Sequence, residues 1–76
     1  MYIINKQMRR IFNTDNLQVV LISPDDSTKI VGVMVDYEDY EDYVVICECP
    51  SSFVARTKWE SLAISLREGD KFFDID

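Results

Sequence analysis

The sequence has no histidine, and it has only two glycines, two prolines and two cysteines among its 76 residues. Without histidine it lacks the commonest general base, and neither Cys47 nor any serine has a histidine to activate it as a nucleophile. Gly32 and Gly69 are the only glycines, so a glycine-rich phosphate-binding loop is excluded. A chain this short also offers no evident cleft for a substrate. We therefore expect one domain, residues 1–76, that is not an enzyme and binds no cofactor.

Long apolar runs are missing as well. No apolar stretch reaches the roughly 18 residues of a membrane span, so we expect no membrane partner. The opening segment, MYIINKQMRRIF, lacks the apolar run behind a basic start that marks a secretory signal. These absences favour a cytoplasmic protein.

The two cysteines, Cys47 and Cys49, are separated by one residue. On a strand they share a face with Cα atoms roughly 6.5–7 Å apart, which is at or beyond the upper end of comfortable disulfide geometry. With no third cysteine and no histidine, they fall short of the roughly four ligands that a zinc site needs. We expect two small buried or half-buried thiols in a reducing compartment and no metal site. A redox role, or a metal shared between subunits, is the alternative.

Four segments have the composition of β-strands, rich in β-branched and aromatic residues. Turn-forming residues separate them, namely NTDN at 13–16 and Pro24 with the polar residues that follow it. Gly32 inside the third segment marks a bulge or a close backbone approach. The predicted strands are residues 1–13, 17–23, 29–35 and 43–48.

One helix is predicted after these strands. Thr57 and Glu60 match the capping box T-x-x-E, in which a hydroxyl and a carboxylate each satisfy a free backbone N–H. Gly69 is placed to end the helix in a left-handed conformation. Residues 52–56 are expected to form a short extended arm, and the tail 71–76 is expected to dock on the body. An apolar stripe at helical spacing is formed by Trp59, Leu62, Ala63 and Leu66.

These elements predict an α+β fold, a four-stranded antiparallel meander followed by one C-terminal amphipathic helix packed on one sheet face. In the third strand, Ile30 and Met34 lie on one face, and Val31, Val33 and Val35 lie on the other. Both faces are therefore apolar. One helix cannot bury both faces of a four-stranded sheet, and this mismatch favours a homodimer.

Most of the net charge of −6 comes from one short segment. Residues 36–42 hold five of the 14 acidic residues and no basic one, so the rest of the chain has nine acids against eight bases. We expect the acidic, tyrosine-rich segment 36–43 to form the hairpin between the third and fourth strands. The predicted partner-binding residues are Tyr37, Glu38, Asp39, Tyr40, Glu41 and Asp42.

Tyrosine gives rigid contact area, and clustered carboxylates attract a basic partner, so this segment predicts protein–protein contact. One alternative is that the carboxylates imitate phosphates and inhibit a nucleic-acid-binding protein. A second is a purely structural, dimerising accessory protein whose acidic tip is inert and only prevents edge pairing. A calcium site is a weaker option, because the segment has no glycine and no D-x-D-x-D-G pattern. Direct nucleic-acid binding is not expected, because the basic residues are scattered.

The opening twenty residues, MYIINKQMRRIFNTDNLQVV, also carry a resemblance. They resemble the start of many small uncharacterised proteins of Gram-positive bacteria and their phages and mobile elements. The resemblance implies an α+β fold, a short amphipathic C-terminal helix and a mobile-element or accessory context, and it carries over no catalytic residue. The residues that carry it are Met1, Tyr2, Ile3, Ile11, Phe12, Asn13, Asp15 and Asn16.

Overall fold

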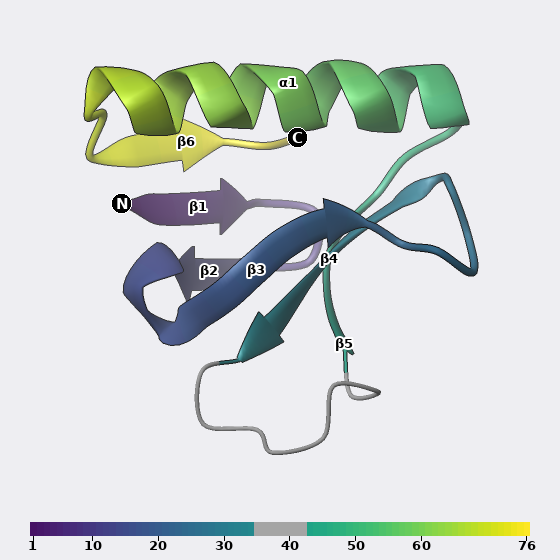
Figure 1. Ribbon diagram of the computed structural model, residues 1–76, viewed down its shortest axis with the longest axis horizontal. Coiled ribbons are helices and arrows are strands. Elements are labelled where there is room, and N and C mark those ends of the chain that lie inside the picture. The colour runs from purple at the N-terminus through teal and green to yellow at the C-terminus, as the bar shows by residue number, and fades with distance from the viewer. Residues whose placement is uncertain (35–42) are drawn as a thin grey trace.

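The computed structural model (Figure 1) describes residues 1–34 and 43–76, and its described part contains one α-helix and two three-stranded sheets. The α+β class is confirmed, whereas the single four-stranded meander is wrong. A short 3₁₀ turn, η1, precedes β3. The elements are β1 (Tyr2–Asn5), β2 (Arg10–Asn13), η1 (Thr14–Asn16), β3 (Leu17–Ile22), β4 (Lys29–Met34), β5 (Tyr43–Glu48), α1 (Ser52–Glu68) and β6 (Phe72–Asp74).

The sheet β3-β4-β5 is an antiparallel meander at the positions that the sequence predicted. Asp26 accepts hydrogen bonds from the backbone N–H and the hydroxyl of Thr28 and so shapes the turn between β3 and β4. At Gly32 the close neighbours are side chains, because a Cβ there would lie 3.0 Å from Ile46 Cδ1 and 3.2 Å from Leu17 Cδ2. In the pairing of β4 with β5, Ile30 faces Cys47 and Val31 faces Val45, so Ile46 is the extra residue of a bulge.

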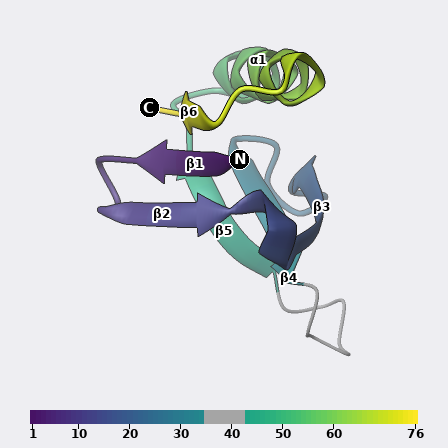
Figure 2. The same cartoon turned by 90° about the vertical axis from the view of Figure 1, so that its left-hand side faces the viewer.

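The second sheet, β2-β1-β6, comes from both ends of the chain. The predicted first strand, residues 1–13, is instead two strands that pair antiparallel across a turn in which Arg9 has a φ of 54°. The tail does dock, and it does so as β6, which pairs in parallel with β1. Figure 2 shows β6, β1 and β2 lying side by side below α1.

The helix α1 begins earlier than its predicted capping box. Ser51 is the N-cap, and its side chain accepts the Val54 N–H at 3.2 Å. The predicted extended arm 52–56 is therefore helical, and Thr57 lies inside the helix, where its hydroxyl donates to the Phe53 carbonyl at 3.0 Å. The predicted end is confirmed, because Gly69 is left-handed with a φ of 77°.

One hydrophobic core joins both sheets and the helix. Asn5 is buried beside it: its amide donates to the Ile46 carbonyl at 2.8 Å, and its carbonyl accepts the Met8 N–H at 3.0 Å. The side chain thus ties the end of β1 to the bulge in β5. The helix packs against β3 and β4. The core residues are Ile3, Phe12, Ile30, Ile46, Cys47, Cys49, Ala55, Leu62 and Ile75.

Both faces of β4 are buried, as the apolar pattern predicted. Ile30 belongs to the shared core, whereas Val31 and Val33 lie on the opposite face of the strand. On that opposite face, cross-strand pairing places Leu21 and Val45 on either side of Val31. Apolar side chains therefore continue across both sides of this small sheet.

Candidate functional site

The contact surface predicted from the sequence, Tyr37 to Asp42, lies outside the described residues. It stays a prediction. The first described residue after it is Tyr43, which opens β5 and is exposed. The candidate site that the structure itself presents lies elsewhere, between α1 and β3.

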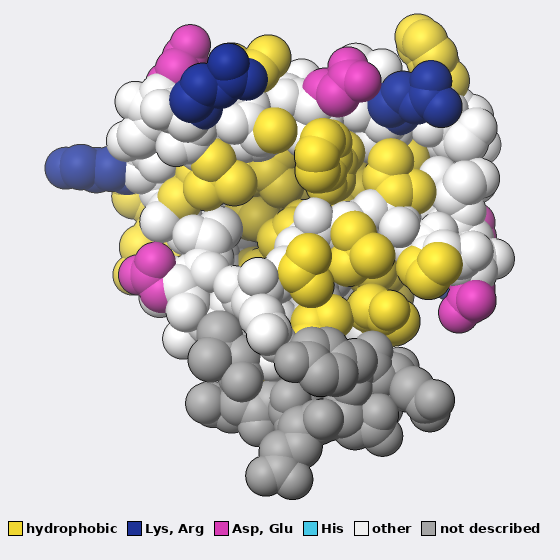
Figure 3. All heavy atoms as spheres, in the orientation of Figure 1, with side chains coloured by type: hydrophobic (Ala, Val, Ile, Leu, Met, Phe, Trp, Pro, Cys, Tyr) yellow, Lys and Arg dark blue, Asp and Glu magenta, His cyan; other side chains and the backbone are white. Residues whose placement is uncertain are grey.

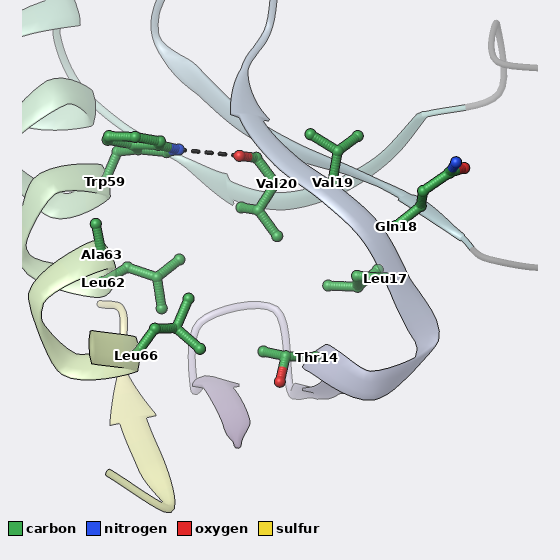
Figure 4. Close-up of a pocket in the computed structure, with 9 residues that line it drawn as sticks. All are labelled: Thr14, Leu17, Gln18, Val19, Val20, Trp59, Leu62, Ala63 and Leu66. Atoms are coloured by element: carbon green, nitrogen blue, oxygen red, sulfur yellow. Dashed lines mark hydrogen bonds between the residues drawn. The ribbon is translucent and has the colours of Figure 1, made fainter. Parts of the chain in front are cut away.

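This site is an apolar groove of about 310 Å³ that is open to solvent. Figure 4 shows Leu62 and Leu66 of α1 pointing toward β3, and Leu17 of β3 pointing toward α1. Trp59 lies at one end of the groove and Thr14 lies at the other. In Figure 3 the hollow between α1 and β3 is lined with hydrophobic side chains. None of the described residues that line it is charged.

Trp59 fixes the distance between the two walls. Its indole N–H donates to the Val20 carbonyl at 3.0 Å, so this end of the groove is closed. The other end of the groove lies at Thr14. Leu62 is 2% exposed, whereas Leu66, one turn further along α1, is 44% exposed. The apolar stripe of the helix therefore covers the core at Leu62 and opens to solvent at Leu66.

The strand wall of the groove also presents main-chain groups, because β3 is the outer strand of its sheet. The Ser23 N–H donates to the Lys29 carbonyl across the sheet at 2.9 Å, whereas the Val20 carbonyl accepts from α1. Main-chain groups of successive strand residues point to opposite sides. Val20 and Ile22 thus turn their backbone groups away from β4.

The sequence contained part of the signal for this site. All four residues of the predicted stripe, Trp59 to Leu66, line the groove. A stripe of this kind usually covers a core, and nothing in its spacing shows which end stays open. The β3 wall also depends on the order of strands in the sheet, which periodicity alone does not provide. The sequence therefore predicts the helix wall of the groove, but not the groove itself.

The two cysteines lie side by side in the core. Both are buried, as expected, and their sulfur atoms are 3.7 Å apart. Burial, together with the hydrogen bond to Cys49, raises the pKa of the Cys47 thiol to about 11. A thiol that stays protonated at neutral pH is a poor nucleophile. Residues 1–34 and 43–76 contain no group of three or more His, Cys, Asp or Glu side chains that could hold a metal ion.

Comparisons with protein-family models, with curated proteins and with solved structures found no match for this chain. Within the described ranges, the helix is neither long enough nor apolar enough to cross a membrane. The resemblance of the first twenty residues to small proteins of Gram-positive bacteria and their phages stays a prediction. The groove is therefore interpreted on its own geometry.

Proposed function

We propose that this protein is a non-enzymatic binding protein, and that the groove between α1 and β3 receives an extended apolar segment of a partner protein. The observation that carries this proposal is the pairing of an uncharged, solvent-open apolar groove with the outer strand of a sheet. Side-chain pockets beside a strand edge are a recurring arrangement for binding peptides in an extended conformation. The apolar, uncharged lining supports a binding role for the groove.

The size of the groove favours side chains over a whole cofactor. Its volume of about 310 Å³ is at the lower end of the range of small-molecule sites. An extended segment would place alternate side chains against Leu17, Leu62 and Leu66. Its backbone would then run beside β3 between Thr14 and Val20, where the Trp59 indole closes the groove. Apolar burial would supply most of the affinity, and backbone pairing would set the orientation.

The acidic segment predicted from the sequence would add charge to this interaction. Residues 36–42 hold five carboxylates, so a partner whose apolar segment is flanked by Lys or Arg would be attracted over a longer range. This long-range attraction would mainly raise the rate of association, and it would change the contacts in the groove little. It predicts binding that weakens as salt rises, while the apolar part remains.

Trp59 is the only tryptophan in the chain, so its fluorescence reports directly on the groove. The experiment titrates the full chain with short synthetic peptides in which Val or Leu alternates with Lys. The expected result is a saturable change in Trp59 emission, together with NMR shifts of the backbone amides of Leu17–Ile22. No response to any such peptide would overturn the proposal.

Two variants of one helix provide the matched control. Leu66→Asp introduces a carboxylate into the groove at a position that is already 44% exposed, and it should weaken peptide binding at least about tenfold. Phe53→Asp makes the same change in charge at a helix side chain that is 76% exposed and does not line the groove. This second variant should bind as the wild type does. Equal binding by Leu66→Asp and the wild type would contradict the assignment.

A further inference from the structure

The sheet β2-β1-β6 leaves an apolar surface on the side that faces away from the core. Along β1 the side chains alternate: Ile3 and Asn5 are buried, whereas Tyr2 is 45% exposed and Ile4 is half-buried. Each outward position of β1 has one apolar cross-strand partner, Phe72 for Tyr2 and Ile11 for Ile4, while the partners on the other side are Asn13 and Asp74. Ile11 and Phe72 are 67% and 63% exposed. This side of the sheet is therefore apolar and open to solvent.

The exposed side chains form one continuous surface. The rings of Tyr2 and Phe72 are stacked, with centroids 5.9 Å apart. Phe72 and Ile64 line the same shallow hollow between β6 and α1, so the surface extends from the sheet onto the helix. On the other flank, Ile4 and Ile11 are cross-strand partners. We name these five residues, Tyr2, Ile4, Ile11, Ile64 and Phe72, the outer apolar face.

We propose that two copies of this chain associate through the outer apolar face. The area of the outer apolar face is consistent with a second copy of the chain as its partner. At the observed exposures, the five residues leave roughly 400–500 Å² of mostly apolar surface, within the roughly 300–600 Å² of the largest patch on a typical monomer. Apolar area is about 65% of a homodimer interface, so a face of this size implies roughly 700 Å² on each partner. A stable interface of standard size buries about 800 Å² on each partner.

The net charge of the chain restricts where two copies can meet. A protein with a net charge of −6 repels itself, so its copies can meet only where carboxylates are sparse. The outward-facing positions of the three strands carry one charged side chain, Asp74, whereas Glu68 and Asp70 also line the hollow that joins Phe72 to Ile64, so the contact would centre on the strands. A two-fold axis would place the Tyr2–Phe72 ring pair of one copy against the same sheet face of its partner. Two sheets stacked in this way would bury both faces about 10 Å apart.

This inference is independent of the groove, because the outer apolar face shares no residue with the groove lining. The experiment measures the molar mass of the full chain by sedimentation equilibrium over a range of concentrations. The expected mass at high concentration is twice the 8.9 kDa of one chain. A wild-type protein that stays monomeric throughout would overturn self-association and leave the face to a different protein partner.

Matched variants assign the dimer to this face. Ile11→Lys places a charge in the interface and should raise the dimer dissociation constant at least about tenfold. Phe53→Lys makes the same change in charge at a helix residue that is 76% exposed and lies outside the face, so it should dimerise as the wild type does. Leu66→Asp, the groove variant, should also remain dimeric. An Ile11→Lys protein that dimerises as tightly as the wild type would overturn the proposal.

If circular dichroism shows that Ile11→Lys does not fold, the interface can still be tested on the wild-type protein. In a dilution series followed by NMR, concentration-dependent shifts should fall on the amides of β1, β2 and β6. Shifts confined to β3 would mean that the copies meet at the groove, and would overturn the proposed interface. Because the groove is tested by peptide titration and this face by mass, failure of one proposal is distinguishable from failure of the other.

Discussion

The two sheets of this protein are specified by different kinds of sequence information. In β3-β4-β5 every strand has six residues, and each strand pairs with its neighbour in the chain. In β2-β1-β6 the strands have four, four and three residues, and β6 pairs with a strand from the opposite end of the chain. The local pattern of residue types identifies a sheet such as β3-β4-β5, whose paired strands are neighbours in the chain. The second kind depends on a distant partner that no local pattern reports.

The prediction with the largest expected effect tests whether the two sheets unfold separately. Ile3 of β1 and Ile30 of β4 are both fully buried in the shared core. Ile3→Ala and Ile30→Ala should therefore each lower the free energy of unfolding by about 2–5 kcal/mol. Urea unfolding followed by circular dichroism and by Trp59 fluorescence should give one coincident transition for each variant. An Ile3→Ala protein that keeps the wild-type Trp59 midpoint would show that β2-β1-β6 is an independent unit.

The next effect tests the polar link between the sheets. Asn5→Ala leaves the buried Ile46 carbonyl and the Met8 N–H without their partner, and should cost about 1–3 kcal/mol. Asn13→Ala is the control, because Asn13 makes only an exposed bond to the Asp15 N–H and its loss should cost about 1 kcal/mol or less. Urea midpoints compare the two variants. Equal losses of stability in the two variants would show that the buried hydrogen bonds of Asn5 stabilise the fold no more than an exposed turn contact does.

A third test uses pH to probe how deeply β5 is buried beneath the rest of the protein. Burial and Cys49 raise the pKa of Cys47 from 9.0 to about 11, Asp76 adds to the shift and Lys58 opposes it. Burial favours the neutral form of the Cys47 thiol in the folded state. The resulting stabilisation of the folded state is fully present below pH 9 and is lost as pH rises through about 11. The loss amounts to about 2 kcal/mol. Cys47→Ala should show a weaker fall in stability between pH 8.5 and 11, and an unchanged pH dependence would contradict the burial of this thiol.

The smallest effect concerns the start of α1, the helix that packs against β3 and β4. Ser51→Ala removes the N-cap acceptor of the Val54 N–H and should cost about 1 kcal/mol. Thr57→Ala, at the position that the sequence suggested as the cap, removes only an exposed mid-helix bond to the Phe53 carbonyl and should be close to neutral. Thermal unfolding of both variants measures the difference. A larger loss for Thr57→Ala would place the functional helix start where the capping box suggested.

Much of the larger sheet and the end of the helix could be predicted from the sequence, since each depends on neighbours in the chain. Gly69 and the turn after Pro24 are examples of residues whose conformational preference is strong enough to act alone. The split of residues 1–13 was missed because its turn has no glycine or proline, and Arg9 supplies the left-handed residue. Ser51 was missed as the cap because a better-matching capping box follows it within the same helix.

The candidate site was predictable only in part, for a related reason. The apolar stripe marked one wall of the groove, but its opening at Leu66 follows from the path of β3, which is set by strand order. The outer apolar face could not be foreseen, because β1 and β6 had not been recognised as partners. The acidic segment 36–42 was the most conspicuous feature of the sequence, and its role stays a prediction because it lies outside the described residues.

The parallel pairing of β1 with β6 has a consequence for biosynthesis. Tyr2 pairs with Phe72, and hydrogen bonds continue the pairing from the Tyr2 N–H to Lys71 and from the Ile75 N–H to Ile4. On a translating ribosome, β1 emerges early and its neighbour emerges long afterwards. The edge of β1 that faces β6 therefore stays unpaired until residues 72–74 have been synthesised, and an unpaired strand edge of this kind is a site for aggregation.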